Sequence, residues 1–229
     1  MQDLIAQERF EIEVLDRLNS GKYLSRLAFG GGTMLRLCHG LDRFSVDLDF
    51  WLVKDSRQSR LFTDLREYLS GFYRIEGSAE KFYAILLEKK SPEYPRSLKL
   101  EIRKKMEPFT MEHAIAYSRH SNTQVYLQAI SLESMMASKI AAFLDRKEIR
   151  DVYDMEFLLK RGFAPDAKSE DLKQILKNID SFTKRDYTVK LSSLLEETQR
   201  KYYVTENFKL LKAAIRQRLV PEEKGTDLF

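Results

Sequence analysis

The sequence predicts an α+β fold, a sheet with helices packed against it, followed by a second domain made of helices. Residues 46–53 and 97–104 contain apolar and polar side chains that alternate with the period of a β-strand, and the apolar run at 82–87 also favours a strand. From residue 131 onward the apolar residues recur at helical spacing, with no strand signal. We therefore expect two domains, residues 1–125 and residues 126–229.

The remaining elements follow in order along the chain. Apolar residues at helical spacing predict a helix over residues 3–18, and a short strand at 24–29 leads into a glycine turn. Thr33 stands where a helix N-cap would, before an apolar run. Further helices are expected at residues 61–72, 135–144, 152–159, 172–179, 189–195 and 208–219.

The strand at residues 46–53 carries two aspartates, Asp47 and Asp49, separated by one residue. Successive strand side chains point to opposite faces, so both carboxylates project from the same face, about 7 Å apart. Two like charges this close favour a compensating cation, and hard oxygen ligands select Mg²⁺ or Mn²⁺. The alternative is the solvated polar face of an edge strand.

The glycine turn and the residues after it favour an anion site beside these carboxylates. Gly31 and Gly32 permit backbone conformations in which N–H groups approach a ligand closely. A helix beginning at this turn would attract phosphate, and Arg43 and Ser45 are further donors to phosphate oxygens. We therefore expect the phosphates of a nucleotide at this turn.

The strand at residues 97–104 adds a third carboxylate. Glu101 alternates with Leu100 and Ile102, so it faces away from the apolar set and could complete a triad with Asp47 and Asp49. The alternative is an exposed strand residue between two bases.

On these residues, the chain resembles the AbiEii type of abortive-infection toxin, within the nucleotidyltransferase superfamily that has a DNA polymerase beta type of palm. The matching residues are Gly31-Gly32-Thr33, Arg43-Phe44-Ser45 and Asp47-Leu48-Asp49, with further likeness at residues 98–102, 139–143 and 150–154. The resemblance implies a mixed palm sheet with flanking helices, followed by a helical bundle.

The resemblance also implies a metal-dependent nucleotidyltransferase. Its Mg²⁺ or Mn²⁺ ions would be held by the three carboxylates. The nucleoside triphosphate would be bound by Gly31, Gly32, Thr33, Arg43 and Ser45, and pyrophosphate would leave. It further implies a phosphate-binding role for Lys139 and a place near the cleft for Asp151 and Asp154. From the residues alone, Lys139 can equally be read as a snorkelling side chain. The two aspartates can equally be read as charges that stabilise a helix N-terminus.

The same resemblance implies the toxin of a toxin–antitoxin pair, with a separately encoded antitoxin and an RNA acceptor such as tRNA. Basic clusters at residues 89–90, 103–105 and 184–185 are candidate phosphate contacts, or ordinary solvated charge. Two other functions stay open, a non-catalytic nucleotide-binding regulatory module and a helical module that binds RNA or protein. The base of the nucleotide cannot be read from the sequence.

Composition is consistent with this interpretation. The 229 residues are 43% hydrophobic, enough for a substantial core, and the net charge of +4 does not by itself establish nucleic-acid binding. Cys38, the single cysteine, has no partner for an internal disulfide, and with His39 it offers too few ligands for zinc. There is neither a leader-like N-terminus nor a membrane-length apolar run, so we expect a cytoplasmic protein with no membrane contact.

Overall fold

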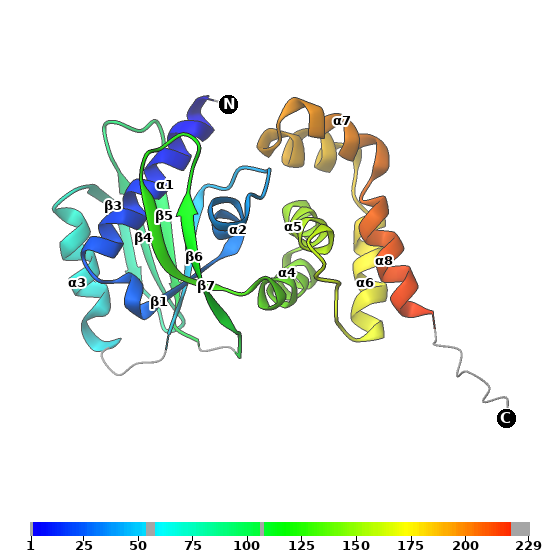
Figure 1. The fold of residues 1–229 in the computed structure, drawn as a ribbon, viewed down its shortest axis with the longest axis horizontal. Coiled ribbons are helices and arrows are strands. Elements are labelled where there is room, and N and C mark those ends of the chain that lie inside the picture. The colour runs from blue at the N-terminus through cyan, green and yellow to red at the C-terminus, as the bar shows by residue number, and fades with distance from the viewer. Residues whose placement is uncertain (1, 54–57, 106–107, 221–229) are drawn as a thin grey trace. The chain divides into compact units, whose positions relative to one another are not determined.

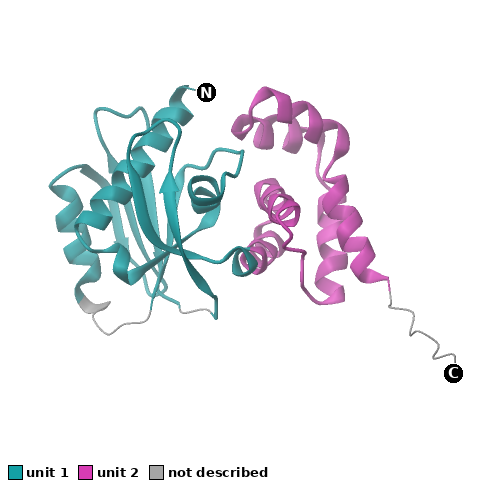
Figure 2. Cartoon of the chain, viewed as in Figure 1, with its two compact units in different colours: residues 1–135 teal, residues 136–229 magenta. Residues whose placement is uncertain are grey.

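The computed structural model describes residues 2–53, 58–105 and 108–220, and only the backbone of residues 58 and 59. Two compact units divide the chain, residues 1–135 and residues 136–229 (Figure 2). The first contains the sheet and the second is helical, which confirms the predicted α+β class.

The first unit is built on a seven-stranded mixed sheet (Figure 1). Its strand order is β3-β4-β5-β2-β1-β7-β6, in which the β2–β5 and β1–β7 pairs are parallel and the other pairs antiparallel. The strands are β1 (Leu27–Gly30), β2 (Asp47–Leu52), β3 (Arg74–Glu80), β4 (Ala84–Lys90), β5 (Leu98–Arg103), β6 (Met111–Tyr117) and β7 (Gln124–Ile130).

Helices cover the apolar side of this sheet. α1 (Gln2–Ser20) contacts β5 and β7, α2 (Gly31–His39) contacts β2 and β6, and α3 (Gln58–Ser70) contacts β3. Phe10 of α1 stacks on Tyr94 with ring centroids 4.5 Å apart. The residues that alternate with this buried set project from the other face of the central strands, and they include Asp47, Asp49 and Glu101.

The second unit consists of helices. α4 (Leu132–Arg146) begins in the first unit and continues into the second, where it is followed by α5 (Ile149–Lys160), α6 (Ser169–Asp180), α7 (Glu197–Glu206) and α8 (Lys209–Leu219). Aromatic side chains fill its core, for example Tyr203, whose ring lies 4.7 Å from that of Tyr153 and 5.2 Å from that of Phe208. All three residues are buried and belong to the core of this unit.

The structure differs from the sequence prediction in several elements. β3, β6 and β7 were not expected, and the helix expected at residues 189–195 is a π-helix at Asp186–Leu191 followed by a 3₁₀ turn at Ser192–Leu194. The domain boundary expected after residue 125 falls inside β7, whereas the compact units meet after residue 135. β7 belongs with the sheet because it pairs with β1 and β6.

Candidate active site

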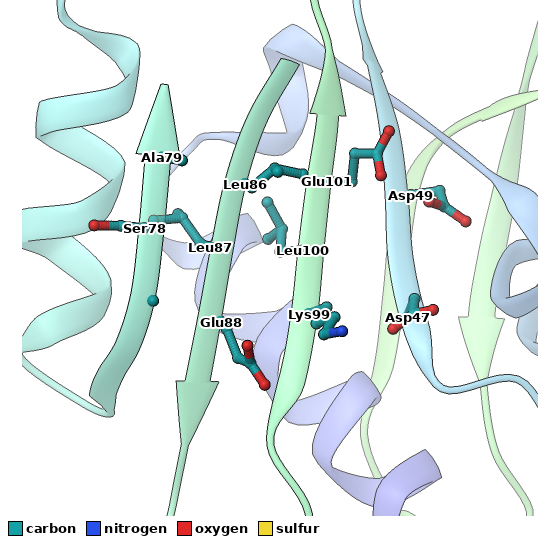
Figure 3. Close-up of a pocket in the computed structure, with 11 residues that line it drawn as sticks. Asp47, Asp49, Ser78, Ala79, Leu86, Leu87, Glu88, Lys99, Leu100 and Glu101 are labelled. Carbon is teal, nitrogen blue, oxygen red and sulfur yellow. The ribbon is translucent and has the colours of Figure 1, made fainter. Parts of the chain in front are cut away.

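The two aspartates of β2 lie on one face of the sheet, as their spacing predicts. Asp47 and Asp49 are half-buried, whereas Leu48 and Phe50 between and beyond them are buried. Figure 3 shows both carboxylates on the same side of the strand. The main chain of β2 is tied to α2, because the buried Thr33 hydroxyl donates a hydrogen bond of 2.6 Å to the Asp47 carbonyl oxygen.

Glu101 is brought beside these aspartates by the parallel pairing of β2 with β5. Asp49 is in register with Glu101, and Asp47 with Lys99 (Figure 3). Nε of Arg103 lies 3.3 Å from the Glu101 carboxylate. The site thus combines three carboxylates with two cations, Lys99 and Arg103. Lys99 is not among the residues predicted from the sequence. Its position two residues before Glu101, on a strand whose side chains alternate, predicts that both share a face.

The glycine turn packs directly against Asp49. Gly31 has φ +76°, and a Cβ added to it would lie 2.9 Å from Cβ of Asp49 and still closer to the carboxylate. A Cβ on Gly32 would lie 2.9 Å from the Ser45 hydroxyl and would collide with the Arg43 guanidinium. Glycine is therefore required at both positions, because the turn, the Arg43–Ser45 segment and β2 approach one another so closely.

The start of α2 corrects one detail of the prediction. The helix begins at Gly31 with Gly30 as its N-cap, so Thr33 lies inside the first turn and is not the N-cap. Its hydroxyl is engaged with Asp47, which makes Thr33 a residue that fixes the strand relative to the helix. The expected helix N-terminus at the glycine turn is present.

The Arg43 side chain is buried and braces the loop before β2. It is 2% exposed, and its Nη1 donates to the Phe44 carbonyl oxygen at 2.9 Å. The Arg36 guanidinium packs over the Phe44 ring, with its Cζ 3.8 Å from the ring centroid. Arg36 also forms an ion pair with Glu8 of α1. Arg43 therefore places positive charge behind the glycine turn while it holds the loop in shape.

Helix α1 contributes buried polar residues behind the site that the sequence did not reveal. Gln7 lies 3.4 Å from the Val46 carbonyl oxygen, and Glu11 is fully buried. Burial, and secondarily the negative charge of Glu8, raises the pKa of the Glu11 carboxyl well above its usual value, although Arg36 opposes this. Burial therefore favours the neutral form of the Glu11 carboxyl.

A pocket of ≈ 370 Å³ opens on the carboxylate face of the sheet. Its wall on the β2 side carries Asp47 and Asp49, and its floor crosses β5 and β4 to β3 (Figure 3). Ala79 and Leu86 give the floor an apolar part beside Glu101. Its volume lies in the range of small-molecule sites, and its lining combines apolar floor with convergent charge, as such sites do.

The donor set fits a divalent cation that arrives with a substrate. Among the residues that the structure describes, no three His, Cys, Asp or Glu side chains are grouped to hold a metal ion. Mg²⁺, however, usually binds one or two carboxylates and completes its octahedron with water and substrate phosphates. Asp47 and Asp49 on one strand face, with Glu101 in register, are hard oxygen donors suited to that mode.

Lys139, Asp151 and Asp154 form a cluster within the second unit. Nζ of Lys139 lies 2.7 Å from Asp154 and 3.4 Å from Asp151, and Arg146 clamps Asp151 with two hydrogen bonds of 2.7 and 2.6 Å. Both aspartates are fully buried and Lys139 is 6% exposed. Lys139 therefore does not snorkel to solvent, and the structure groups these residues with one another.

One of the basic clusters is not a surface feature. Lys89 is fully buried, and burial lowers its pKa to about 7. The expectation that Lys89 contacts RNA phosphates is therefore wrong, because its side chain enters the apolar side of β4.

Comparisons with known proteins agree with this fold. The fold is similar to that of JHP933 from Helicobacter pylori, with TM-score 0.54 and 19% identity over 93% of this chain and 94% of that one. It is also similar to a structure from H. pylori described as a nucleotidyltransferase, with TM-score 0.55 and 19% identity over 92% of this chain and 97% of that one. At this identity the likeness establishes the fold alone. No curated protein matches the sequence.

Within the described ranges, no helix combines the length and apolar character needed to cross a membrane.

The sequence of almost the whole chain also matches one protein family. The model of the family "Nucleotidyl transferase AbiEii toxin, Type IV TA system" matches residues 13–220. The chain therefore belongs to the AbiEii family of nucleotidyltransferase toxins.

Proposed function

We propose that this nucleotidyltransferase moves a nucleoside monophosphate from a nucleoside triphosphate to a hydroxyl of RNA, with the help of a divalent cation bound at Asp47 and Asp49. The observation that carries the proposal is the packing of the glycine turn on Asp49 at the edge of a pocket. This packing brings the N-terminus of α2, whose free N–H groups favour anions, next to two carboxylates, which favour cations. A metal–triphosphate complex needs both.

The chain's own residues divide into two groups around the nucleotide. The N-terminus of α2 and the buried charge of Arg43 favour the triphosphate. Asp47 and Asp49, with Glu101 beside them, would hold Mg²⁺ or Mn²⁺. When bound, the cation neutralises charge on the phosphates and polarises the acceptor hydroxyl.

The transfer itself is a substitution at the α-phosphorus. A bond forms between the acceptor oxygen and the α-phosphorus, the bond to the bridging oxygen of the β-phosphate breaks, and pyrophosphate leaves. Glu101 would take the proton of the attacking hydroxyl, and its position in the pocket lining, in register with Asp49, supports this role. Most of the acceleration would come from positioning and charge stabilisation, as is general for phosphoryl and nucleotidyl transfer.

The test is incubation of the purified protein with each nucleoside triphosphate, radiolabelled at the α-phosphate, together with Mg²⁺ and total cellular RNA. We expect label on RNA with one or more of the nucleotides, and a loss of about 100-fold or more in Asp47→Asn and Asp49→Asn. Asp64→Asn is the matched control, because Asp64 is an exposed carboxylate on α3 in the same unit. Unchanged transfer in folded Asp47→Asn would show that the carboxylates do not bind the cation.

The labelled product also separates the alternatives. Label on protein would show that the acceptor is a protein and not RNA. Nucleotide binding without label on RNA or protein would favour the regulatory module. Transfer that persists after chelation of divalent cations would remove the metal from the proposal. A helical module that binds RNA or protein would bind equally well without metal and would produce no label.

Further assignments stay predictions. These are tRNA as the acceptor, a separately encoded antitoxin, a cytoplasmic location, and a role for Lys139, Asp151 and Asp154 in transfer. The last is tested by asking whether Lys139→Met loses transfer while the helical unit stays folded. The buried ion pairs of Lys139 make a loss of folding the competing explanation.

A further inference from the structure

The turn between β3 and β4 displays two aromatic side chains to solvent. Phe82 is 84% exposed and Tyr83 67%, and their rings meet edge to face with centroids 4.6 Å apart. No large hydrophobic side chain among the described residues is more exposed than Phe82. Two adjacent aromatic rings in water are unfavourable for folding, so their exposure calls for a functional explanation.

The main chain holds this turn rigidly at the edge of the pocket. The Lys81 N–H donates to the Ala84 carbonyl oxygen at 2.7 Å, which closes the hairpin. The Lys104 N–H donates to the Tyr83 carbonyl oxygen at 2.9 Å, which ties the tip to the end of β5. In Figure 3, β3 and β5 both end at the edge beyond Ala79 and Glu101. The tip therefore borders the end of the pocket at which Ala79 and Glu101 lie.

Basic residues surround the two rings. We call Lys81, Phe82, Tyr83, Arg103, Lys104 and Lys105 the hairpin patch. Its two acidic neighbours are already engaged, Glu80 with Lys104 at 2.7 Å and Glu101 with Arg103 at 3.3 Å. Lys81 and Lys105 are exposed. Four cations therefore stand against two carboxylates around an aromatic pair.

We propose that the hairpin patch binds an unpaired segment of the acceptor RNA, an inference that rests on the proposed function. Bases stack on Phe82 and Tyr83, and the basic side chains contact the phosphates. Aromatic rings interleaved with positive charge are the general means by which proteins hold single strands, and unpaired bases are the ones free to stack. The patch lies next to Glu101 and so directs the hydroxyl end of the strand toward the carboxylates.

The chemistry of the patch favours RNA over a protein partner. Protein hot spots are apolar anchors surrounded by contacts that exclude water and are poor in lysine. Opposite this turn, Arg103 is instead in register with Ala84, and the Lys104 main chain bonds to Tyr83, with Lys105 next in sequence. The positive charge of these long side chains is complementary to the negative charge of a phosphate backbone.

The experiment measures RNA binding separately from transfer, using the full chain and fluorescein-labelled oligouridylate in an anisotropy titration. The double variant Phe82→Ser, Tyr83→Ser should bind roughly tenfold or more weakly for each ring that stacks. Lys81→Gln with Lys105→Gln should weaken binding and lower the slope of log affinity against log salt by about 0.7 for each phosphate that the protein no longer neutralises. Tyr117→Ser is the control, because Tyr117 is a 53% exposed aromatic on another hairpin, at the end of β6, and should bind like wild type.

The outcomes separate this inference from the proposed function. Wild-type affinity in both hairpin variants overturns the inference while leaving nucleotidyl transfer intact. RNA binding that depends on the hairpin, without transfer by the wild type, supports the inference and refutes the proposed function. If the serine variants instead bind RNA normally but turn a dimer into a monomer in sedimentation, the patch is a protein interface and the inference is wrong.

Discussion

The close packing of Gly31 on Asp49 predicts that an alanine at this position damages both stability and transfer. Gly31 has φ +76°, where an alanine costs about 1–2 kcal/mol in backbone strain. The added methyl would also push against the Asp49 side chain, and overpacking of this kind costs typically 1–3 kcal/mol. We therefore expect Gly31→Ala to lower the free energy of unfolding by about 2–5 kcal/mol.

Gly162 supplies a control for the backbone part of this cost. It has φ +92°, and a Cβ added there would meet nothing within 4 Å. Gly162→Ala should therefore cost only about 1–2 kcal/mol and leave transfer unchanged. The difference between the two variants measures the displacement of Asp49.

The assay uses the single tryptophan of the sequence. Trp51 lies in β2, 3% exposed, so its fluorescence during urea unfolding reports on the first unit. Far-UV circular dichroism follows both variants in parallel. In the radiolabel assay, a displacement of Asp49 by about 1 Å should reduce transfer roughly 100-fold in Gly31→Ala. If Gly31→Ala is as stable as Gly162→Ala and transfers at the wild-type rate, the glycine turn does not pack on Asp49 as described.

Three further outcomes are expected. Lys139→Met should lower the stability of the helical unit by about 3–5 kcal/mol, measured by thermal unfolding, because buried Asp151 and Asp154 lose an ammonium partner; a change below about 1 kcal/mol would contradict the buried ion pairs. Lys89, with its pKa lowered to about 7, binds fewer protons in the folded than in the unfolded state between pH 7 and about 10. The free energy of unfolding should therefore rise with pH across this range. The variant Lys89→Met should be more stable than wild type near pH 7 and should lack that rise. The Cys38 thiol, whose pKa burial raises to about 12, should react with a maleimide at pH 8 only upon unfolding, and rapid labelling of the native protein would show that it is accessible.

The sequence revealed the part of the site that depends on local periodicity. Asp47 and Asp49 share a face because strand side chains alternate, and this alternation is visible in the five residues 46–50. The place of Glu101 depends on the register of β5 against β2, which no local pattern specifies. It was predicted through the family resemblance, and the structure places Glu101 opposite Asp49.

Other elements were missed for physical reasons. Phe82 and Tyr83 favour a strand by propensity, so a strand was expected from residue 82, but both lie in the turn before β4. β3 and β6 are the two edge strands of the sheet, and neither has a regular alternation of apolar and polar residues. Lys89 resembled a surface base next to Lys90, because charge alone does not reveal which face of a strand is buried.

The order of the strands also bears on when the protein becomes active during its synthesis. β1 and β2 lie at the centre of the sheet, but their outer neighbours, β5 and β7, come later in the chain. Phe29 of β1, for example, pairs with Ala129 of β7, which is synthesised 100 residues later. Contacts between residues so far apart form slowly, because a long loop closes before they gain any stabilisation. A ribosome-bound fragment that ends before β5 contains both aspartates and the glycine turn but has no Glu101. Under the proposed function, which requires Glu101, a cell making this toxin would therefore be exposed to the active enzyme only after most of the first unit has left the ribosome.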